Sequence, residues 1–347
     1  MIGNIISGSD DKKILTFAVP GGKVYINDYY TNSPDSFLNI SITGQKCQLM
    51  CRHCRKELLK GMQEAGDSRR LVELVEKYIN KAGNTGTICH SASGKKPAGN
   101  TLPNEGPGQD KDAGTSENIK GSISGMLISG GFDHGGKLPV KNILAGIKEL
   151  KSKYPFLTIY IHTGFLDAKE AAALKSSGVD AVLVNLIGSL KAIREVYNLE
   201  DRTYSDYLDT IKVLKDQGLK VSPHIVIGLE DGKLSGEFKT VKDALALGVD
   251  SLVFVILKKA SKTVDFTSSK VPDDDIIRLV KYARGLSGDI PLSFGCARPP
   301  GKNRHLLEIE LIKAGIDSIA FPSERTIRFA VENKIAHTFV EKCCAIL

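Results

Sequence analysis

The stretch "DAVLVNLIGSLKAIREVYNLEDRTYSDYLDTIKVLKDQGLKVSPHIVIG", residues 180–228, places two apolar, β-branched runs on either side of a helical pattern. The runs "DAVLVNLIG" and "LKVSPHIVIG" are short and mostly apolar, which is typical of parallel strands that are buried on both faces. The intervening "RTYSDYLDTIKVLKDQG" ends in a glycine, a common signal for the end of a helix. The stretch therefore predicts a strand–helix–strand unit.

The same alternation extends over most of the 347 residues. Six further strand-like runs, each followed by a helical pattern, are "FLNISITG", "GMLISGG", "LTIYIHTG", "DSLVFVIL", "IPLSFG" and "DSIAFPS". Eight such units in about this length predict an α/β fold, a (β/α)8 barrel of the TIM type. A doubly wound open sheet is the alternative, because periodicity alone does not establish closure. We expect the barrel over residues 37–335, after an N-terminal extension (1–36) and before a cysteine-containing tail (336–347).

One segment, residues 83–121, interrupts this pattern. It is rich in Gly, Pro, Ser, Asn and Lys, and its large aliphatic residues are Ile88, Leu102 and Ile119. Such a composition buries too little apolar surface to offset the entropy that ordering costs. We predict a long, flexible insert after the first helix of the barrel.

Composition excludes several classes of function. The formal charge is +7, but the basic residues are interspersed with acidic ones and form no dense block with aromatic residues, so we expect no nucleic-acid partner. The longest strongly apolar run, "SLVFVIL", is far below the roughly 20 residues of a membrane span. The N-terminus has no apolar signal-peptide core, and seven cysteines with a tight cluster do not resemble a disulfide framework. We therefore expect a cytoplasmic protein without a membrane partner.

Three of the seven cysteines, Cys47, Cys51 and Cys54, lie within eight residues directly after the first strand of the predicted barrel. Thiolates are soft ligands that suit zinc or an iron–sulfur cluster. A structural zinc site requires four ligands, whereas three thiolates leave one iron of a four-iron cluster open to an outside ligand. Because barrel enzymes hold their chemistry at the carboxyl ends of the strands, the position favours a catalytic cluster.

The C-x3-C-x2-C spacing after the first strand of a β/α barrel resembles that of the radical S-adenosylmethionine (SAM) superfamily. The resemblance implies that Cys47, Cys51 and Cys54 hold a 4Fe–4S cluster whose open iron binds SAM. It also implies that the reduced cluster cleaves SAM to methionine and a 5′-deoxyadenosyl radical, which abstracts hydrogen from a substrate. An electron donor such as ferredoxin or flavodoxin is then a partner.

Further matches support this resemblance. "SGG", ending at Gly131, is similar to the superfamily's Gly-Gly-Glu element, although Phe132 and Asp133 stand where the acid is expected. "HIVIGLEDG", beginning at His224, resembles the element that packs on adenine. On this basis the residues expected to contact SAM are His53, Gly130, Gly131, Asn185, Arg202, Val226, Ile227 and Gly228.

Residues 180–233 are most similar to biotin synthase and its kin. Biotin synthase holds a sacrificial 2Fe–2S cluster through barrel cysteines, but this chain has Ile161 and His162 in one of those regions and Ser222 in the other. The chain therefore resembles the biotin-synthase-related proteins of archaea and some bacteria, among them the two-subunit lipoyl synthase.

The resemblance implies a transferase that inserts sulfur into protein-bound octanoyl-lysine. Its partners would be a second radical SAM subunit and a lipoyl-carrier protein or peptide. Cys296, Cys343 and Cys344 are then candidate ligands of a second iron–sulfur cluster. One alternative is radical rearrangement or cofactor maturation, as in the hydrogenase-maturase and methylornithine-synthase relatives. Another is a non-catalytic partner subunit that binds a cluster or zinc.

Overall fold

The computed structural model describes residues 13–84 and 123–345, apart from 259, 261, 263, 265, 267, 268 and 300. The predicted insert, 83–121, lies almost entirely outside these residues. Its flexibility stays a prediction.

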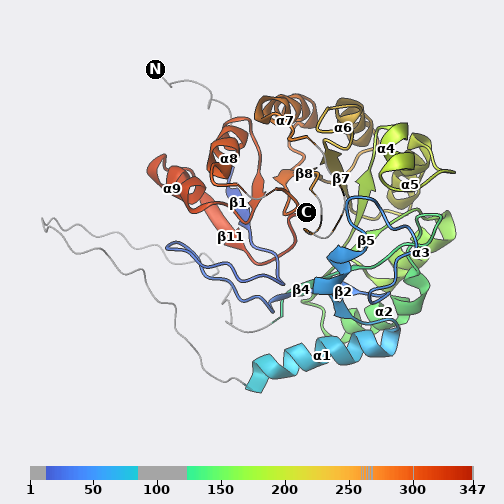
Figure 1. Ribbon diagram of the computed structural model, residues 1–347. Coiled ribbons are helices and arrows are strands. Elements are labelled where there is room, and N and C mark those ends of the chain that lie inside the picture. Colours follow the sequence, from blue (N-terminus) through green and yellow to red (C-terminus); the bar gives the residue numbers. More distant parts are fainter. Residues whose placement is uncertain are drawn as a thin grey trace, which may run out of the picture.

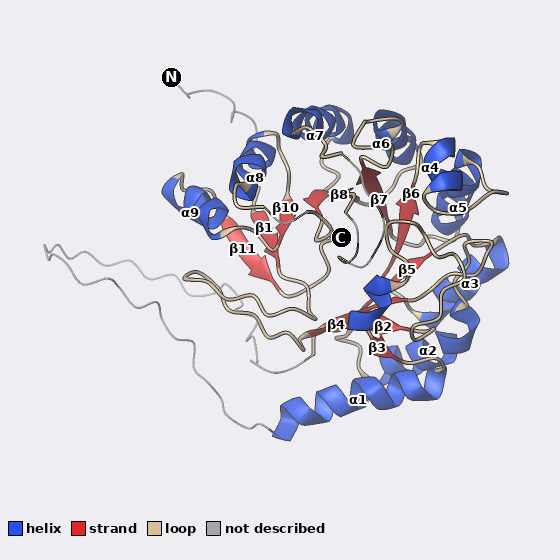
Figure 2. Ribbon diagram, in the orientation of Figure 1, coloured by secondary structure: helices blue, strands red, loops and turns tan. Residues whose placement is uncertain are grey.

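The strands of the described residues form one curled, parallel sheet (Figures 1 and 2). Its order is β11-β1-β10-β9-β8-β7-β6-β5-β4-β2-β3. The strands are β1 (Leu15–Ala18), β2 (Phe37–Ser41), β3 (Gln63–Glu64), β4 (Gly125–Ser129), β5 (Thr158–Thr163), β6 (Ala181–Leu186), β7 (Val221–Ile227), β8 (Leu252–Ile256), β9 (Leu292–Phe294), β10 (Ser318–Ala320) and β11 (His337–Val340).

Helices surround the outer face of the curled sheet (Figure 1). They are α1 (Ser68–Asn84), α2 (Leu144–Lys153), α3 (Ala168–Ser177), α4 (Leu190–Glu195), α5 (Tyr204–Asp216), α6 (Glu237–Ala246), α7 (Asp273–Ser287), α8 (Arg304–Lys313) and α9 (Glu324–Glu332), with short 3-10 helices η1 (Glu57–Gly61) and η2 (Val140–Ile143). The apolar side chains of the strands and of the inner helix faces form one core between the two layers.

Three helix-to-strand turns share one sequence pattern: a glycine, then an aliphatic residue, then an aspartate. Gly178 ends α3 in a left-handed conformation with φ 88°, which a glycine adopts without strain. Asp180 then accepts a hydrogen bond from Ile159 N on β5 at 2.7 Å. Asp250 and Asp317, each preceded by the same pattern, bond the first amides of β7 and β9 at the same distance. The hydrogen bond from the adjacent strand to the aspartate fixes the position at which the strand after the turn begins.

The eight predicted strands are present as β2 and β4 to β10, and the curled parallel sheet confirms the barrel class. Within the described residues the hydrogen-bonded ladder ends at β3 and β11, so strand pairing does not close the barrel. The sequence predicted no strand in 1–36 or in 336–347, yet β1 and β11 lie there. Strands of four residues are too short to show a periodic pattern, and only the neighbouring edge of the sheet selects them.

The C-terminal segment spans the open side of the sheet and ends near the middle of the curl (Figure 1). The Glu341 carboxylate accepts hydrogen bonds from Ser33 N at 3.1 Å and Tyr30 Oη at 2.9 Å. Its carbonyl accepts one from Ser124 Oγ, next to β4, at 3.3 Å. These contacts lead Cys343 and Cys344 into the core, where both are buried.

Candidate functional site

The three clustered cysteines lie in the loop after β2, at the carboxyl edge of the sheet. Cys47, Cys51 and Cys54 are free and partly accessible. The Cys51 carbonyl accepts hydrogen bonds from Cys54 N at 3.0 Å and Arg55 N at 2.9 Å, which makes the turn between the last two cysteines tight. Burial, followed by the charges of Cys54 and Cys47, raises the pKa of the Cys51 thiol. The three thiols are therefore electrostatically coupled neighbours from one loop.

The loop after α4 holds the cysteine loop in place. Asn198, at φ 56°, donates from Nδ2 to the carbonyls of Leu49 and Met50, both at 2.9 Å. The Cys51 thiol donates to the Tyr197 carbonyl at 3.9 Å. Sequence reasoning missed Tyr197 and Asn198. The sequence held one weak signal for Asn198, namely that asparagine adopts the left-handed backbone conformation more readily than most residues.

The two glycines after β4 pack directly on the cysteine loop. Gly131 N donates to Thr43 Oγ1 at 2.7 Å. A Cβ at Gly131 would lie 1.9 Å from the Lys46 carbonyl oxygen and 2.5 Å from Cys47 Cβ, and one at Gly130 would lie 3.0 Å from Thr43 Oγ1. Gly131 therefore requires glycine, because its neighbour is backbone, and it brings this element against the first cysteine.

The remainder of the loop after β4 contacts the predicted SAM ligand Arg202. Arg202 donates from Nε to the Gly135 carbonyl at 3.1 Å and from Nη1 to Asp206 at 3.2 Å. Asp133, which stands where the family's acid is expected, is exposed and accepts a hydrogen bond from Lys137 N at 2.8 Å. Arg202 thus lies beside the glycine element, whereas the Asp133 carboxylate serves a turn.

The element at the end of β7 is well packed. Val226 is 8% exposed and Ile227 is fully buried, so the Ile227 side chain does not face solvent. Gly228 has φ 87°, its amide donates to Glu237 Oε1 at 3.0 Å, and a Cβ there would lie 2.3 Å from Val271 Cγ2. Sequence reasoning missed Glu237, a buried carboxylate that fixes this turn.

His53 connects the cysteine loop with the segment after β8. Its carbonyl accepts a hydrogen bond from Ala260 N at 2.8 Å. Its ring lies 5.2 Å from the Tyr197 ring and 6.3 Å from the Phe266 ring, centroid to centroid. Burial lowers its pKa to about 4, so the imidazole is neutral near pH 7. Its Nδ1 is buried without a hydrogen-bond partner.

A second polar group lies on neighbouring strands β5, β6 and β7. The rings of His162 and His224 are 5.3 Å apart, and the side chain of Asn185 hydrogen-bonds His162. Burial lowers the pKa of His162 to about 4, and burial with the nearby charge of His162 lowers that of His224 to about 3. The His224 Nδ1 atom is buried, and the described residues include no hydrogen-bond partner with good geometry for it. These are neutral hydrogen-bonding groups, which suits contact with an organic ligand.

The structure brings the remaining described cysteines together. The Cys344 thiol lies next to the thiols of Cys296 and Cys343. Cys296 follows β9 and is exposed, whereas Cys343 and Cys344 are buried. Within the described ranges, no three His, Cys, Asp or Glu side chains are grouped closely enough to hold a single metal ion. No described helix is long and apolar enough to cross a membrane.

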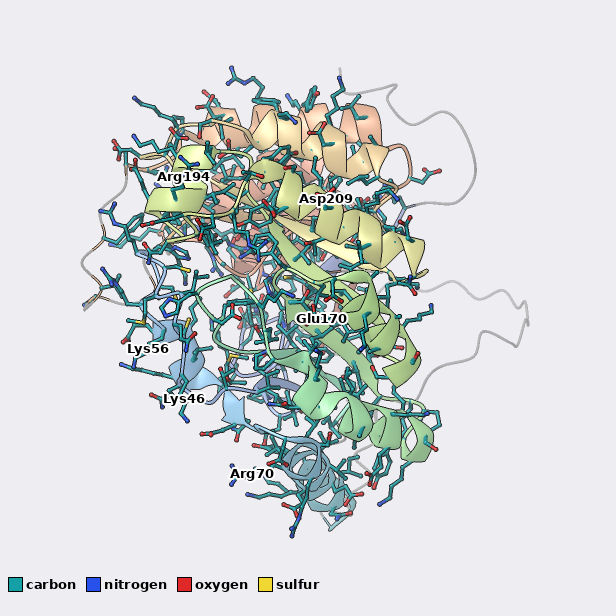
Figure 3. The ribbon with its side chains drawn as sticks, turned by 90° about the vertical axis from the view of Figure 1, so that its right-hand side faces the viewer. Lys46, Lys56, Arg70, Glu170, Arg194 and Asp209 are labelled. Carbon is teal, nitrogen blue, oxygen red and sulfur yellow. The ribbon has the colours of Figure 1, made fainter. Side chains whose placement is uncertain are left out.

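The outer side of the cysteine loop is basic. Lys46, Arg52, Arg55 and Lys56 are all exposed. Figure 3 shows Lys46 and Lys56 projecting from the same edge of the molecule. This edge carries a positive surface within a few residues of each thiol.

Comparisons with known proteins agree with this geometry. No family model matches the chain. The biotin synthase of Cutibacterium acnes is 23% identical over 255 residues, covering 72% of this chain and 58% of the relative. The biotin synthase of Desulforudis audaxviator is 30% identical over 183 residues, covering 53% of each protein. The chain spans about half the length of these curated relatives.

Solved structures share the fold. The crystal structure of the FeFe-hydrogenase maturase HydG has a TM-score of 0.56 with 14% identity and covers 89% of this chain and 57% of that one. HydG from Carboxydothermus hydrogenoformans also has a TM-score of 0.56, with 13% identity, and covers 95% of this chain and 69% of that one. At these identities the likeness shows a common fold.

Proposed function

We propose that this chain, a biotin-synthase-like protein of the radical SAM superfamily, is an enzyme that binds a 4Fe–4S cluster through Cys47, Cys51 and Cys54 and uses it to cleave SAM. The observation that carries the proposal is the packing of Gly131 on Cys47, because it joins two separate motif elements of the family at one place. When bound and reduced, the cluster supplies the electron that cleaves SAM and so starts hydrogen abstraction from an unactivated C–H bond.

The residues around the thiols fit such a group. The tight turn at Cys51 and the Asn198 contacts fix the loop, so that three thiols from one short segment are presented in a defined arrangement. Gly131 packs directly on Cys47, which keeps the glycine element against the loop that would hold the cluster. Arg202, held by Asp206, would contribute positive charge beside the same loop, where the carboxylate of SAM requires it.

We also propose that the basic edge around Lys46 and Lys56 receives the electron donor. Ferredoxins and flavodoxins are small and acidic, and opposite surface charges accelerate encounter and orient the partners. Leu58, in the same edge, is 57% exposed and supplies an apolar contact at the centre of a charged surface.

For the substrate we propose sulfur insertion, with the chain acting as a lipoyl synthase subunit on protein-bound octanoyl-lysine. In this reaction class C–H bonds of the acyl chain are replaced by C–S bonds. The supporting observation is the contact between Cys296 and Cys344, which places thiols from two distant segments side by side. They are the available described ligands for a sulfur-donating second cluster.

A second candidate is radical rearrangement or cofactor maturation, which consumes no sulfur. It is favoured by Ser222, which stands in a region where biotin synthase has a cluster cysteine. Ser222 is fully buried and its hydroxyl hydrogen-bonds that of Ser251 at 2.6 Å, so it is not available to a ligand. A non-catalytic partner subunit is the third candidate.

Anaerobic reconstitution with iron and sulfide tests the common core of these proposals. We expect broad brown absorbance, with about four irons per chain if one cluster is bound and about eight if a second is present. Cys51→Ala should lose most of the absorbance and iron of the cluster at Cys47, Cys51 and Cys54. With dithionite and SAM, the reconstituted protein should form 5′-deoxyadenosine and methionine. Zinc in place of iron would contradict the cluster, and a loaded cluster that never cleaves SAM would favour the non-catalytic candidate.

A further inference from the structure

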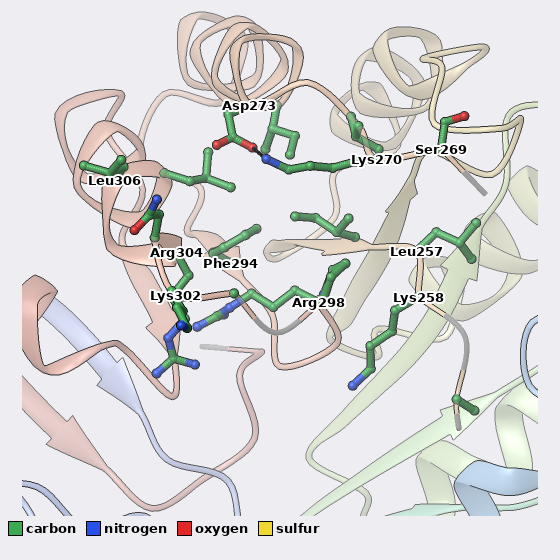
Figure 4. Close-up of a pocket in the computed structure, with 18 of the residues that line it drawn as sticks. Leu257, Lys258, Ser269, Lys270, Asp273, Phe294, Arg298, Lys302, Arg304 and Leu306 are labelled. Carbon is green, nitrogen blue, oxygen red and sulfur yellow. Dashed lines mark ion pairs between the residues drawn. The ribbon is translucent and has the colours of Figure 1, made fainter. Parts of the chain in front are cut away.

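A pocket of about 1040 Å³ lies between β8, β9, α7 and α8 at the carboxyl edge of the sheet (Figure 4). Its volume is at the upper end of the roughly 300–1,000 Å³ that small-molecule sites occupy. None of the three clustered cysteines lines it. The pocket therefore offers space for a ligand beyond the cluster.

The middle of the pocket is apolar. Phe294 and Ile276 line it and are almost completely buried, so they form a fixed floor. Leu306 also lines it but is 56% exposed, an unusual position for a large aliphatic side chain that nothing covers. A ligand chain lying against Leu306 would bury its own apolar surface and that of Leu306 at about 25 cal/mol for each Å².

One side of the pocket is cationic. Figure 4 shows the Lys270–Asp273 ion pair beside α7 and Lys258, Lys302 and Arg304 on the opposite side. Arg304 lies 3.7 Å from Glu308, whereas Lys258 and Lys302 have no carboxylate within ion-pair distance among the residues that the structure describes. Two ammonium groups are thus left to a ligand.

The guanidinium of Arg298 is already engaged. It donates to Glu308 at 2.9 Å and to the Gly295 carbonyl at 2.9 Å, and it lies over the Phe294 ring. Its charge is therefore compensated by Glu308, and it offers little to a ligand in the pocket. Burial, followed by the charges of Lys23 and Arg298, lowers the pKa of Lys258, which is the direction expected where cations crowd together without an anion.

The pocket adjoins the cysteine loop. Phe266 and Ala260 line it, and both contact His53, which lies between Cys51 and Cys54 in the sequence. A chain that enters from the cationic side and extends along the apolar floor would therefore approach the loop that holds the thiols.

From this arrangement we infer that the pocket binds an acyl amphiphile, an aliphatic chain with a negatively charged head, with the chain against Leu306 and the head at Lys258 and Lys302. The inference deepens the proposed function, on which its role as a substrate site rests. If the chain is carried on a protein lysine, the two ammonium groups would face acidic residues of the carrier that flank that lysine.

Calorimetric titration of the full-length protein with octanoate, without cluster or SAM, tests this inference. We expect one saturable site per chain, and affinity that rises about fourfold for each added CH2 from hexanoate to decanoate. Octan-1-ol should bind at least about tenfold more weakly than octanoate, because it lacks the charge that the lysines recognise.

Two variants separate the two halves of the site. Lys302→Gln should weaken the binding of octanoate severalfold and leave the affinity for octan-1-ol unchanged. Leu306→Ala should weaken the binding of both ligands. Lys281→Gln, an exposed position on α7 outside the pocket, is the matched control and should change neither. An octanoyl-lysyl peptide with flanking aspartates should compete with octanoate more strongly than the same peptide with flanking asparagines, if the natural ligand is carrier-bound.

Absence of saturable octanoate binding would overturn the inference, as would equal binding of octan-1-ol or no effect of Lys302→Gln and Leu306→Ala. Because the titration needs no radical chemistry, its outcome is independent of SAM cleavage. A protein that binds octanoate but never cleaves SAM would refute the proposed function and leave the pocket assignment standing. A protein that cleaves SAM but does not bind octanoate would refute the pocket assignment and leave SAM cleavage standing.

Discussion

Gly131 lies so close to Cys47 that a Cβ on the glycine would fall 2.5 Å from the cysteine Cβ. The two residues are 84 positions apart in the sequence, and parallel pairing of β2 with β4 brings them together. The sheet thus assembles the thiol loop and the glycine element at one edge before any ligand arrives.

Gly131→Ala should disrupt this contact. The new methyl group would overlap the Lys46 carbonyl oxygen, which is backbone and cannot rotate away. We expect a loss of about 1–3 kcal/mol in the free energy of unfolding and a severalfold lower iron content after reconstitution. Denaturant titration and iron analysis measure the two effects. Gly61→Ala is the control, since nothing lies within 4 Å of a Cβ there, and an equal loss in both variants would contradict the argument.

The stability of the fold should fall between about pH 6.5 and pH 4. His162 and His224 have folded-state pKa values of about 4 and about 3, below the ordinary 6.5, so the unfolded chain binds more protons in this window. The stabilisation is complete above the unfolded pKa and is lost as the pH falls. Urea titrations across this range should show a flatter pH dependence in His224→Gln than in the parent protein. An identical slope in both would refute this assignment.

Reduction of the cluster by a protein donor should depend on the basic edge. Reversing Lys46 and Lys56 to glutamate removes the charges that would attract an acidic ferredoxin or flavodoxin, so we expect SAM cleavage to slow about tenfold or more at low salt. Dithionite, a small reductant, should support the variant nearly as well as the parent. Equal slowing with both reductants would indicate damage to the cysteine loop, and no slowing with the protein donor would place docking elsewhere.

Much of this fold was predictable from sequence, because buried parallel strands and their helices leave strong apolar patterns. The three clustered thiols were predictable for a different reason: their spacing is local. Tyr197 and Asn198 were not, since they act through hydrogen bonds to a loop far away in sequence. Glu237 was not either, because only the folded turn brings backbone amides to its carboxylate. The path of the tail was equally hidden, because the contacts of Glu341 exist only once the sheet has left one side open.

The contact between Cys296 and Cys344 leads to the prediction that best separates the candidate reactions. Sulfur insertion needs a sulfur source, and the regions in which biotin synthase has its cluster ligands contain His162 and Ser222 in this chain. A donor cluster would therefore use Cys296, Cys343, Cys344, the residues of a partner, or Cys89, which lies outside the described residues. Cys296 is the best placed, because among the first three it is the exposed one.

Cys296→Ser should leave 5′-deoxyadenosine formation close to the parent rate, since the residue lies outside the C-x3-C-x2-C loop. The same variant should yield no thiolated product from an octanoyl-lysyl peptide, with a second subunit added where the reaction requires one. Iron analysis provides a readout that is independent of turnover: the parent should hold about eight irons and the variant about four. A triple variant of Cys296, Cys343 and Cys344 that still transferred sulfur would exclude these three as donor ligands and leave the partner or Cys89. A parent protein with about four irons and no sulfur transfer would favour rearrangement or cofactor maturation.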